Sequence, residues 1–241
     1  MFFHRITRYY IFMNTFEKIL IDLNDCKEDQ KFIDFVTPIV NTKTKIIGVK
    51  TPNLKKIANK YSNMEIDGFI RNYSYETNFI YVTNFLKKAK NIDECFILLT
   101  TNIDLIDTWA LTDSTFKMIK TSHDFNKDEI SIEKFLCSKK EFIIRYGFLL
   151  LFEYGKDPSL SEVVLNKIFD SKYFYVMMVE AWLISIVAVY NFEAAYKYLK
   201  ESNIDLKIKL KAISKCRDSF RINEDQKTKL KNLREKLKGN F

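Results

Sequence analysis

The sequence predicts an all-α protein, a helical-repeat solenoid of the HEAT or armadillo kind with a concave basic face. The 241 residues include only five Gly and three Pro, whereas a sheet protein of this size needs many turns rich in both. Apolar residues recur at three- and four-residue spacing, as in Leu206, Ile208, Leu210 and Ile213, which indicates amphipathic helices. An apolar fraction of 47% is enough for a sizeable core.

Capping residues mark the helix starts in order along the chain. The first amphipathic pattern, NTFEKILIDL, begins after Met13. Thr51 and Pro52 have the form of an N-cap followed by Pro at the first helical position. Capping boxes pair the N-cap side chain with a residue three positions later, and they predict starts at Asn91/Glu94, Ser138/Glu141, Ser159/Glu162 and Asn223/Gln226. Asn191 and Asp205 mark two more starts, so we expect roughly a dozen helices of about 10–18 residues.

The spacing of these starts predicts the organisation of the chain. The caps at 51, 91 and 138 lie 40 and 47 residues apart, which is the period of paired-helix repeats. No Pro- or Ser-rich linker interrupts the chain, so residues 1–241 are expected to form a single helical-repeat domain. Arg5 and Arg8 interrupt the apolar start, which is therefore not a signal peptide. We expect residues 1–12 to be a non-native or disordered extension, and the start codon, Met1 or Met13, is left open.

One apolar run, YFYVMMVEAWLISIVAVY (residues 173–190), has about the minimum length for a membrane span. It carries Glu180 and has no partner span, which favours a helix buried on all sides in a soluble protein. We also expect the protein to be a cytoplasmic, nucleoid-associated monomer. The four Cys are far apart and match no metal or redox spacing. We expect them to be reduced and mostly to serve as packing residues. With only two His, neither a metal site nor a cofactor is predicted.

Charge is concentrated near the end of the chain. The whole sequence has 39 basic and 31 acidic residues, a net charge of +8. Between Asp205 and Lys238, twelve Lys or Arg stand against five Asp or Glu, a net charge of +7. A basic surface suggests a polyanionic partner, most often nucleic acid or an anionic membrane. A solvated helix face is the alternative interpretation, and it is the commoner one for a Lys run alone.

The segment IDTWALTDS carries the first candidate site. On a helix, Trp109 and Asp113 lie one turn apart on one face, and an indole beside a carboxylate suits a cation. Arg145 lies in the apolar segment EFIIRYGFLLLFEYG, and Trp182 lies in the run that holds Glu180. Charged residues in apolar helices need partners and cluster at functional sites.

Structural roles explain the same residues and are the commoner outcome for such patterns. Asp113 could cap a helix that begins at STFKMIK. Trp109 and Trp182 could be core residues, and Arg145 could form a structural ion pair with Glu180 or with Glu141.

Five segments, taken in order, resemble the AlkD-like family of DNA alkylation repair proteins, which are HEAT-like helical solenoids. The similarity runs from about Gly48 to Lys236. The segments are GVKTPNLKKIA (Gly48–Ala58), WALTDS (Trp109–Ser114), EFIIRYGFLLLFEY (Glu141–Tyr154), AWLIS (Ala181–Ser185) and KCRDSFRIN (Lys215–Asn223).

The resemblance implies a monofunctional glycosylase that excises N3- or N7-alkylated purines from double-stranded DNA. Asp113 would stabilise the oxocarbenium-like transition state and orient water. Trp109 and Trp182 would pack against the sugar and backbone of the damaged nucleotide. Contacts to phosphates are implied for Arg145, and for Arg217 and Arg221, which are expected one turn apart.

Two alternatives remain open from the sequence. In the first, the chain is a non-catalytic DNA-binding solenoid that recognises damaged or unusual duplex structure. Ser185 favours it because glycosylase members carry Arg there, and Glu180 favours it because it would place negative charge near the DNA. In the second, the chain is a protein-binding module, against which the net charge of +7 near its end argues. The enzyme is the favoured interpretation.

Overall fold

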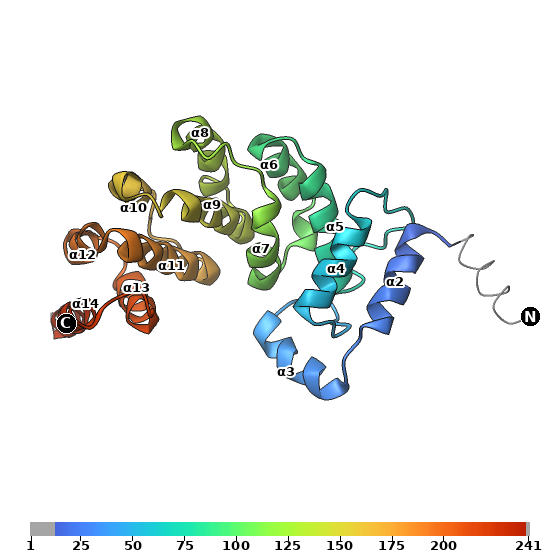
Figure 1. The fold of residues 1–241 in the computed structure, drawn as a ribbon, viewed down its shortest axis with the longest axis horizontal. Helices are drawn as coiled ribbons and strands as arrows, with labels where there is room; N and C mark the ends of the chain where they lie inside the picture. The colour runs from blue at the N-terminus through green and yellow to red at the C-terminus, as the bar shows by residue number, and fades with distance from the viewer. Residues whose placement is uncertain (1–12, 240–241) are drawn as a thin grey trace, which may run out of the picture. The chain divides into compact units, whose positions relative to one another are not determined.

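The computed structural model describes residues 13–239, so the expectation for residues 1–12 lies outside the described residues. The all-α prediction is confirmed: the described residues form helices and no β-strand, apart from an isolated bridge between Lys27 and Val49. The α-helices are α2 (Thr15–Asp25), α3 (Gln30–Val40), α4 (Thr51–Tyr61), α5 (Tyr75–Lys88), α6 (Ile92–Thr101), α7 (Trp109–Thr115), α8 (Phe125–Leu136), α9 (Glu141–Tyr154), α10 (Ser161–Leu165), α11 (Phe174–Tyr190), α12 (Phe192–Glu201), α13 (Leu206–Asp218) and α14 (Glu224–Gly239) (Figure 1). Three short 3-10 helices accompany them: η1 (Ile103–Leu105), η2 (Phe116–Met118) and η3 (Pro158–Leu160).

The helices fall into two compact units, divided between Lys120 and Thr121. We describe each unit by itself. The expectation of a single domain, and with it a concave basic face, stays a prediction.

In the first unit, α5 is the central helix. It packs against α2, α4 and α7, and nearly all of its middle residues are buried. The core between these helices includes Ile19, Leu23, Leu54 and Phe79. In contrast, α3 contributes no fully buried residue, although its sequence is strongly amphipathic. The apolar face of α3 is therefore only partly covered, and it borders a cavity described below.

In the second unit, α11 is the central helix and packs against α9, α12 and α13. Phe174, Trp182 and Tyr190 are exposed on this helix, so the prediction of burial on all sides is wrong at these positions. They are exposed because α9, α12 and α13 cover only part of the helix surface. Among residues 13–239, no helix is both long enough and apolar enough to cross a membrane.

The predicted helix starts are confirmed where the capping side chain accepts a hydrogen bond from a backbone N–H of the first turn. Asn223 and Gln226 exchange both capping-box hydrogen bonds, at 3.1 and 2.9 Å. The Asn191 side chain caps α12, and the Asp205 side chain caps α13. Asn91 accepts a hydrogen bond from the Glu94 N–H at 2.9 Å, but the Glu94 carboxylate accepts from the Lys90 N–H instead of completing the box.

Three predicted N-caps are wrong by one to two residues. Thr51 is the first residue of α4, and Lys50 stands at the N-cap without a side-chain hydrogen bond. Ser138 accepts from the Lys140 N–H within a turn, so α9 begins only at Glu141. Ser159 donates to Asp157, whose carboxylate caps η3 instead. In the last two cases, a hydrogen bond to a residue two positions away forms a turn before the helix begins.

All four cysteines are free thiols. Cys95 and Cys216 are buried, and burial raises the pKa of each thiol to about 12. Cys137 is exposed, so the packing role predicted for most of the cysteines does not apply to it.

Candidate functional site

The short helix α7 positions the first two predicted site residues. Thr108 is its N-cap, and the Thr108 side-chain oxygen accepts from the Ala110 N–H at 3.3 Å. Trp109 is the first residue of α7, and Asp113 follows one turn later. The prediction that they lie one turn apart on a helix is confirmed. The alternative cap role for Asp113 is wrong, because Asp113 lies inside α7 and η2 begins without a side-chain cap.

The Trp109 ring is fixed by the end of α3. Its indole N–H donates to the Ile39 carbonyl oxygen at 3.0 Å, and the neighbouring Thr108 hydroxyl donates to the Val40 carbonyl. These carbonyls belong to the last turn of α3, where helix carbonyls have no partner within the helix. The two bonds therefore satisfy the end of α3 and hold the indole in one orientation.

A carboxylate ties the chain before α7 to the segment after α3. Asp107 accepts from the Thr42 hydroxyl at 2.8 Å and from the Lys43 N–H at 2.6 Å. Asn41 adopts the left-handed conformation with φ of 50° and ends α3 there. Hydrogen bonds between four residues on the α3 side and three on the α7 side thus connect the start of α7 to the end of α3.

Trp109 and Asp113 line one cavity of about 260 Å³ in the first unit. Apolar side chains of α3, including Phe32 and Val36, form part of its wall, and Tyr75 of α5 lines it as well. The Thr112 hydroxyl lies 3.2 Å from Asp113 Oδ1 and 2.8 Å from the Trp109 carbonyl oxygen. The cavity therefore offers two carboxylates, Asp113 and Glu76, and three aromatic rings within a mainly apolar lining.

The surroundings of Tyr75 in this cavity raise the pKa of its hydroxyl. Burial raises the pKa of its hydroxyl, and the carboxylates of Glu76, Asp107 and Asp113 raise it further. The same carboxylates would stabilise a cation in the cavity, whereas burial would oppose it.

Glu76 lines this cavity and holds the backbone of the loop before α4. It is 1% exposed and accepts from the backbone N–H groups of Ile47, Gly48 and Val49 at 2.9, 2.8 and 3.4 Å. Gly48 has φ of 97°, and a Cβ there would stand 2.4 Å from Ile33 Cγ1. The loop before α4 can therefore take this shape only with Gly at position 48 and a carboxylate beneath it.

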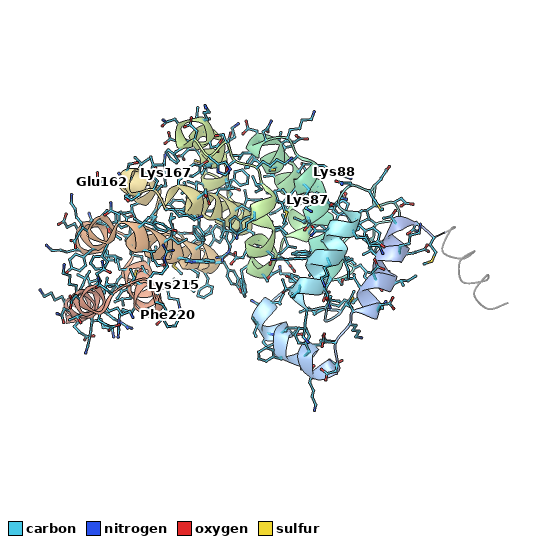
Figure 2. The ribbon with its side chains drawn as sticks, in the orientation of Figure 1. Lys87, Lys88, Glu162, Lys167, Lys215 and Phe220 are labelled. Atoms are coloured by element: carbon cyan, nitrogen blue, oxygen red, sulfur yellow. The ribbon has the colours of Figure 1, made fainter. Side chains whose placement is uncertain are left out.

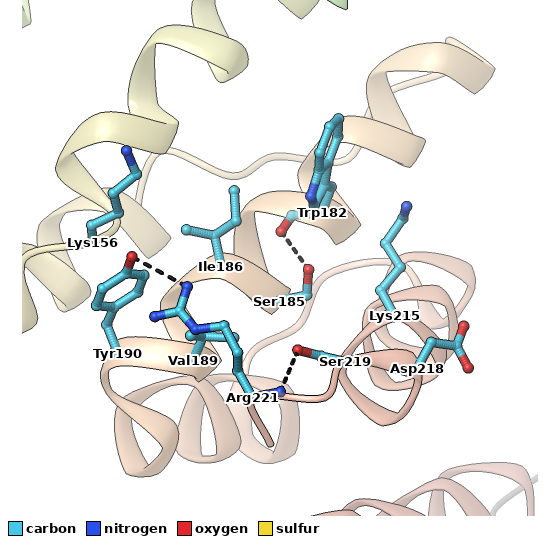
Figure 3. Close-up of a pocket in the computed structure, with 10 residues that line it drawn as sticks. All are labelled: Lys156, Trp182, Ser185, Ile186, Val189, Tyr190, Lys215, Asp218, Ser219 and Arg221. Carbon is cyan, nitrogen blue, oxygen red and sulfur yellow. Dashed lines mark hydrogen bonds between the residues drawn. The ribbon is translucent and has the colours of Figure 1, made fainter.

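Trp182 lies in the second unit, where it lines a separate cavity of about 440 Å³ (Figure 3). Trp182, Ser185 and Tyr190 line it from α11, and further walls come from the segment after α9, from α13 and from the turn that follows α13. The other lining residues are Lys156, Ile186, Val189, Lys215, Asp218, Ser219 and Arg221. Three cations against one carboxylate make this cavity positive.

Two of these cations rest on aromatic rings. Lys215 Nζ lies 5.4 Å from the centre of the Trp182 ring. The Arg221 guanidinium carbon lies 4.5 Å from the centre of the Tyr190 ring, and Arg221 also donates to the Tyr190 hydroxyl at 3.3 Å. Trp182 itself is 36% exposed and packs edge-to-face on Phe152 at 4.7 Å. Aromatic rings in contact with cations suit an anionic ligand that also carries a planar or sugar group.

Ser185 also lines this cavity. Its hydroxyl donates to the Trp182 carbonyl oxygen at 2.7 Å (Figure 3). The side chain therefore folds back on its own helix and adds no charge to the cavity.

Arg145 and Arg217 occupy different surroundings from Arg221. Arg145 is 4% exposed and donates to the Tyr175 carbonyl oxygen at 2.6 Å, while the Tyr175 N–H donates to Glu141 at 2.7 Å. Arg145 thus fastens α9 to the start of α11. Arg217 lies on α13 but is not among the residues that line the 440 Å³ cavity. Because α13 ends at Asp218, Arg217 and Arg221 do not share a helix, and the prediction that they lie one turn apart is wrong.

Glu180 does not present a negative charge to a ligand. It is fully buried, and the Phe169 N–H donates to its Oε1 at 3.3 Å. Its Oε2 has no hydrogen-bond partner. Burial raises the pKa of Glu180 to about 8, so the carboxyl is mainly protonated at pH 7. The expectation of a charge near the DNA is therefore wrong, because the sequence does not show that this position of α11 faces the core.

Four lining residues were not anticipated from the sequence: Tyr75, Lys156, Tyr190 and Lys215. Tyr75 is the first residue of α5, whose capping box pairs Ser74 with Thr77 rather than with Glu or Gln. The start of this helix is therefore harder to recognise in the sequence. Tyr190 could have been found from spacing, whereas Lys215 reaches the cavity from a different helix. Tyr190 lies eight residues after Trp182 on α11, which brings both to one face of a helix.

The fold and the two cavities define a class of protein: an all-α helical-repeat protein with a carboxylate beside an indole in one unit and a basic, aromatic cavity in the other. Residues 18–210 match the family described as DNA alkylation repair enzyme, and the chain belongs to this family. The match crosses the division at Lys120 and includes helices of both units. A search of curated proteins found no match. Membership of the family assigns the chain a role in DNA repair.

Proposed function

We propose that this protein is a monofunctional DNA glycosylase that releases N3- or N7-alkylated purines from duplex DNA. The observation that carries the proposal is the cavity on α7, where the Asp113 carboxylate and the hydrogen-bonded Trp109 indole line the same space. Membership of a DNA alkylation repair family supports alkylated DNA as the substrate class.

The chemistry follows from the charge of the lesion. Alkylation at N3 or N7 makes the purine cationic, so it leaves as a neutral base when the bond between C1′ and the purine nitrogen breaks. The bonding electrons go to the base, and positive charge develops on the deoxyribose. Asp113 stabilises that charge and orients a water molecule towards C1′. Water adds its oxygen to C1′, and its proton passes through the carboxylate to solvent, leaving an abasic sugar.

The aromatic residues hold the cationic nucleotide. Trp109 presents a ring of fixed orientation, because its N–H is engaged by the Ile39 carbonyl. A ring face attracts a cation by about 0.5–2 kcal/mol, depending on how far water is excluded. Trp182 is proposed to pack on the sugar and backbone of the same nucleotide.

The basic residues are proposed to bind the DNA backbone. Arg221 and Lys215 are preorganised for this by their contacts with Tyr190 and Trp182. Arg217 is proposed to add a further phosphate contact from α13. A phosphate contact is also proposed for Arg145, whose guanidinium is fixed by the hydrogen bond to the Tyr175 carbonyl.

Asp113→Asn tests the catalytic assignment. We expect the variant to lose release of N7-methylguanine from duplex DNA while it binds the same duplex with unchanged affinity, because the amide keeps the shape and loses the charge. Released base is measured by chromatography, and binding by fluorescence anisotropy. Asp25→Asn is a matched control, since Asp25 is an exposed carboxylate on α2 of the same unit. Full release by Asp113→Asn would rule out the carboxylate mechanism.

The alternative is a non-catalytic protein that binds damaged or unusual duplex DNA. Ser185 favours it, because its hydroxyl bonds back to the Trp182 carbonyl and leaves uncharged the place where the family resemblance calls for Arg. Glu180 no longer favours it, because that carboxyl is buried and mainly neutral at pH 7. This alternative predicts salt-dependent duplex binding without any base release.

A further inference from the structure

Phe220 is the most exposed large apolar side chain among residues 13–239, with a relative exposure of 103%. It lies in the turn between α13 and α14, next to the basic cavity of the second unit. Figure 2 shows it beside Lys215 at the C-terminal end of the chain. None of the roles proposed above uses it.

The turn that carries Phe220 is held on both sides. The Ser219 N–H donates to the Cys216 carbonyl oxygen at 3.1 Å, and the Arg221 N–H donates to the Ser219 hydroxyl at 3.2 Å. Ile222 is 2% exposed and fixes the chain to the core. The backbone on both sides of Phe220 is therefore held by hydrogen bonds and by packing, while the Phe220 ring is exposed to solvent.

Basic residues flank Phe220 in the sequence. Arg221 follows it directly and is stacked on Tyr190, while Lys215 and Arg217 precede it on α13. Asp218 is the one carboxylate among the neighbouring lining residues. The charges therefore suit a polyanion, and the ring suits a partner with flat apolar faces.

Single exposed apolar residues are common and usually need no explanation. Phe220 differs in that its exposure is complete, its backbone is anchored and its neighbours are preorganised cations. In duplex DNA the phosphates lie at the surface and the flat faces of the bases lie within. Proteins that insert Phe or Leu between base steps combine phosphate contacts with an apolar wedge in this way.

We propose that Phe220 is a wedge that inserts between base pairs of the bound duplex, while Lys215, Arg217 and Arg221 hold the adjacent phosphates. This rests on the proposed function only in taking duplex DNA as the partner. Insertion costs least where a base pair is already weakened, so the wedge would favour damaged over intact sites.

The test is unstacking of 2-aminopurine placed next to a mismatch in a duplex, read as a rise in its fluorescence on binding. We expect the wild type to produce the rise, and Phe220→Ala to lose it and to bind on the order of ten-fold more weakly. Phe220→Trp, which keeps a large ring, should retain both. Because no charge changes, the salt dependence of binding should be the same for all variants. Ile130→Ala is the matched control, since Ile130 is an exposed apolar residue on α8 of the same unit.

The outcomes separate the wedge from the glycosylase. A rise with Phe220→Ala equal to that of the wild type, or no rise with the wild type bound to the duplex, would overturn the wedge; the exposed ring would then fit a protein partner instead. Release of N7-methylguanine, measured in parallel, decides the glycosylase separately. Unstacking without base release supports the wedge and overturns only the enzyme.

Discussion

At the scale of single residues, burial decides what a charged side chain can do. Glu180 lies on the largely apolar helix α11, and Asp113 lies on α7, which mixes apolar and polar residues. Glu180 has one backbone donor and one oxygen without a partner inside the core, whereas Asp113 lines a cavity. The first is therefore a structural, mainly protonated group at pH 7, and the second is the candidate catalytic group.

Glu180 makes the stability of the protein depend on pH. Its pKa is raised from 4.5 to about 8, mainly by burial and also by nearby Asp170, while the hydrogen bond from the Phe169 N–H lowers it. Between these two values the folded state holds a proton that the unfolded state has lost. The Glu180 contribution to the free energy of unfolding is therefore complete below pH 4.5, falls as the pH rises towards 8 and levels off above it, with a slope of up to about 1.4 kcal/mol per pH unit.

Glu180→Gln should remove this fall, because the amide does not titrate. Denaturant unfolding at pH 5, 6.5 and 8 measures the effect. Glu162→Gln is the control, since Glu162 is an exposed carboxylate in the same unit (Figure 2). A pH dependence in Glu180→Gln that matches the wild type would contradict the assignment.

Site residues could be predicted from the sequence where one helix holds the pair. Trp109 and Asp113 are four residues apart, so helical geometry alone makes them neighbours. Tyr75 could not be predicted as their neighbour, because it reaches the cavity from a different helix. For Arg217 and Arg221 the prediction failed because the end of α13 at Asp218 was not visible in the sequence.

At the scale of elements, a buried carboxylate holds the loop that precedes α4. Glu76→Gln keeps the size of the side chain but replaces one acceptor oxygen with an amide that donates towards backbone N–H groups. We expect a loss of about 1–3 kcal/mol in the free energy of unfolding, since buried donors are left without partners. Urea unfolding measures this loss.

Glu65→Gln provides the comparison for this change, because Glu65 is exposed in the same unit. Its unfolding midpoint should stay within error of the wild type. Equal stability of Glu76→Gln and the wild type would mean that the three N–H bonds contribute nothing net.

Element types could be predicted better than element boundaries. The scarcity of Gly and Pro and the three- and four-residue periodicity were sufficient for the all-α class. The starts failed at Ser138 and Ser159 because short polar residues can hydrogen-bond within a turn as readily as they cap a helix. The brevity of α7 and α10, with seven and five residues, was not predicted, because no signal ends them in the sequence.

At the scale of the whole molecule, charge is the property that the sequence shows most directly. The net charge of +7 between Asp205 and Lys238 falls on α13, α14 and the turn between them. Most of α14 is exposed, with Leu230 and Leu233 buried. Part of the excess is therefore a solvated helix face, and Lys215 and Arg221 are the members that line a cavity.

The cavity cations and the helix-face cations should differ in their effect on DNA binding. Replacing Lys215 and Arg221 together with Gln should reduce the slope of log affinity against log salt by about 1.8, roughly 0.9 for each lost phosphate contact. The matched control replaces Lys197 and Lys200, which are exposed on α12. Equal slopes for the two double variants would show that the cavity has no special part in binding.

The central claim is that the wild-type protein breaks a glycosidic bond, and the most direct measurement is the release of free N7-methylguanine from a duplex that carries it. A duplex with unmodified guanine at the same position provides the baseline, and anisotropy on both duplexes confirms that the protein is bound. We predict release from the alkylated duplex alone, at a rate that depends on protein concentration until the duplex is saturated. Binding to the alkylated duplex with no release above the baseline would contradict the account and identify the protein as one that recognises damaged DNA without excising the base.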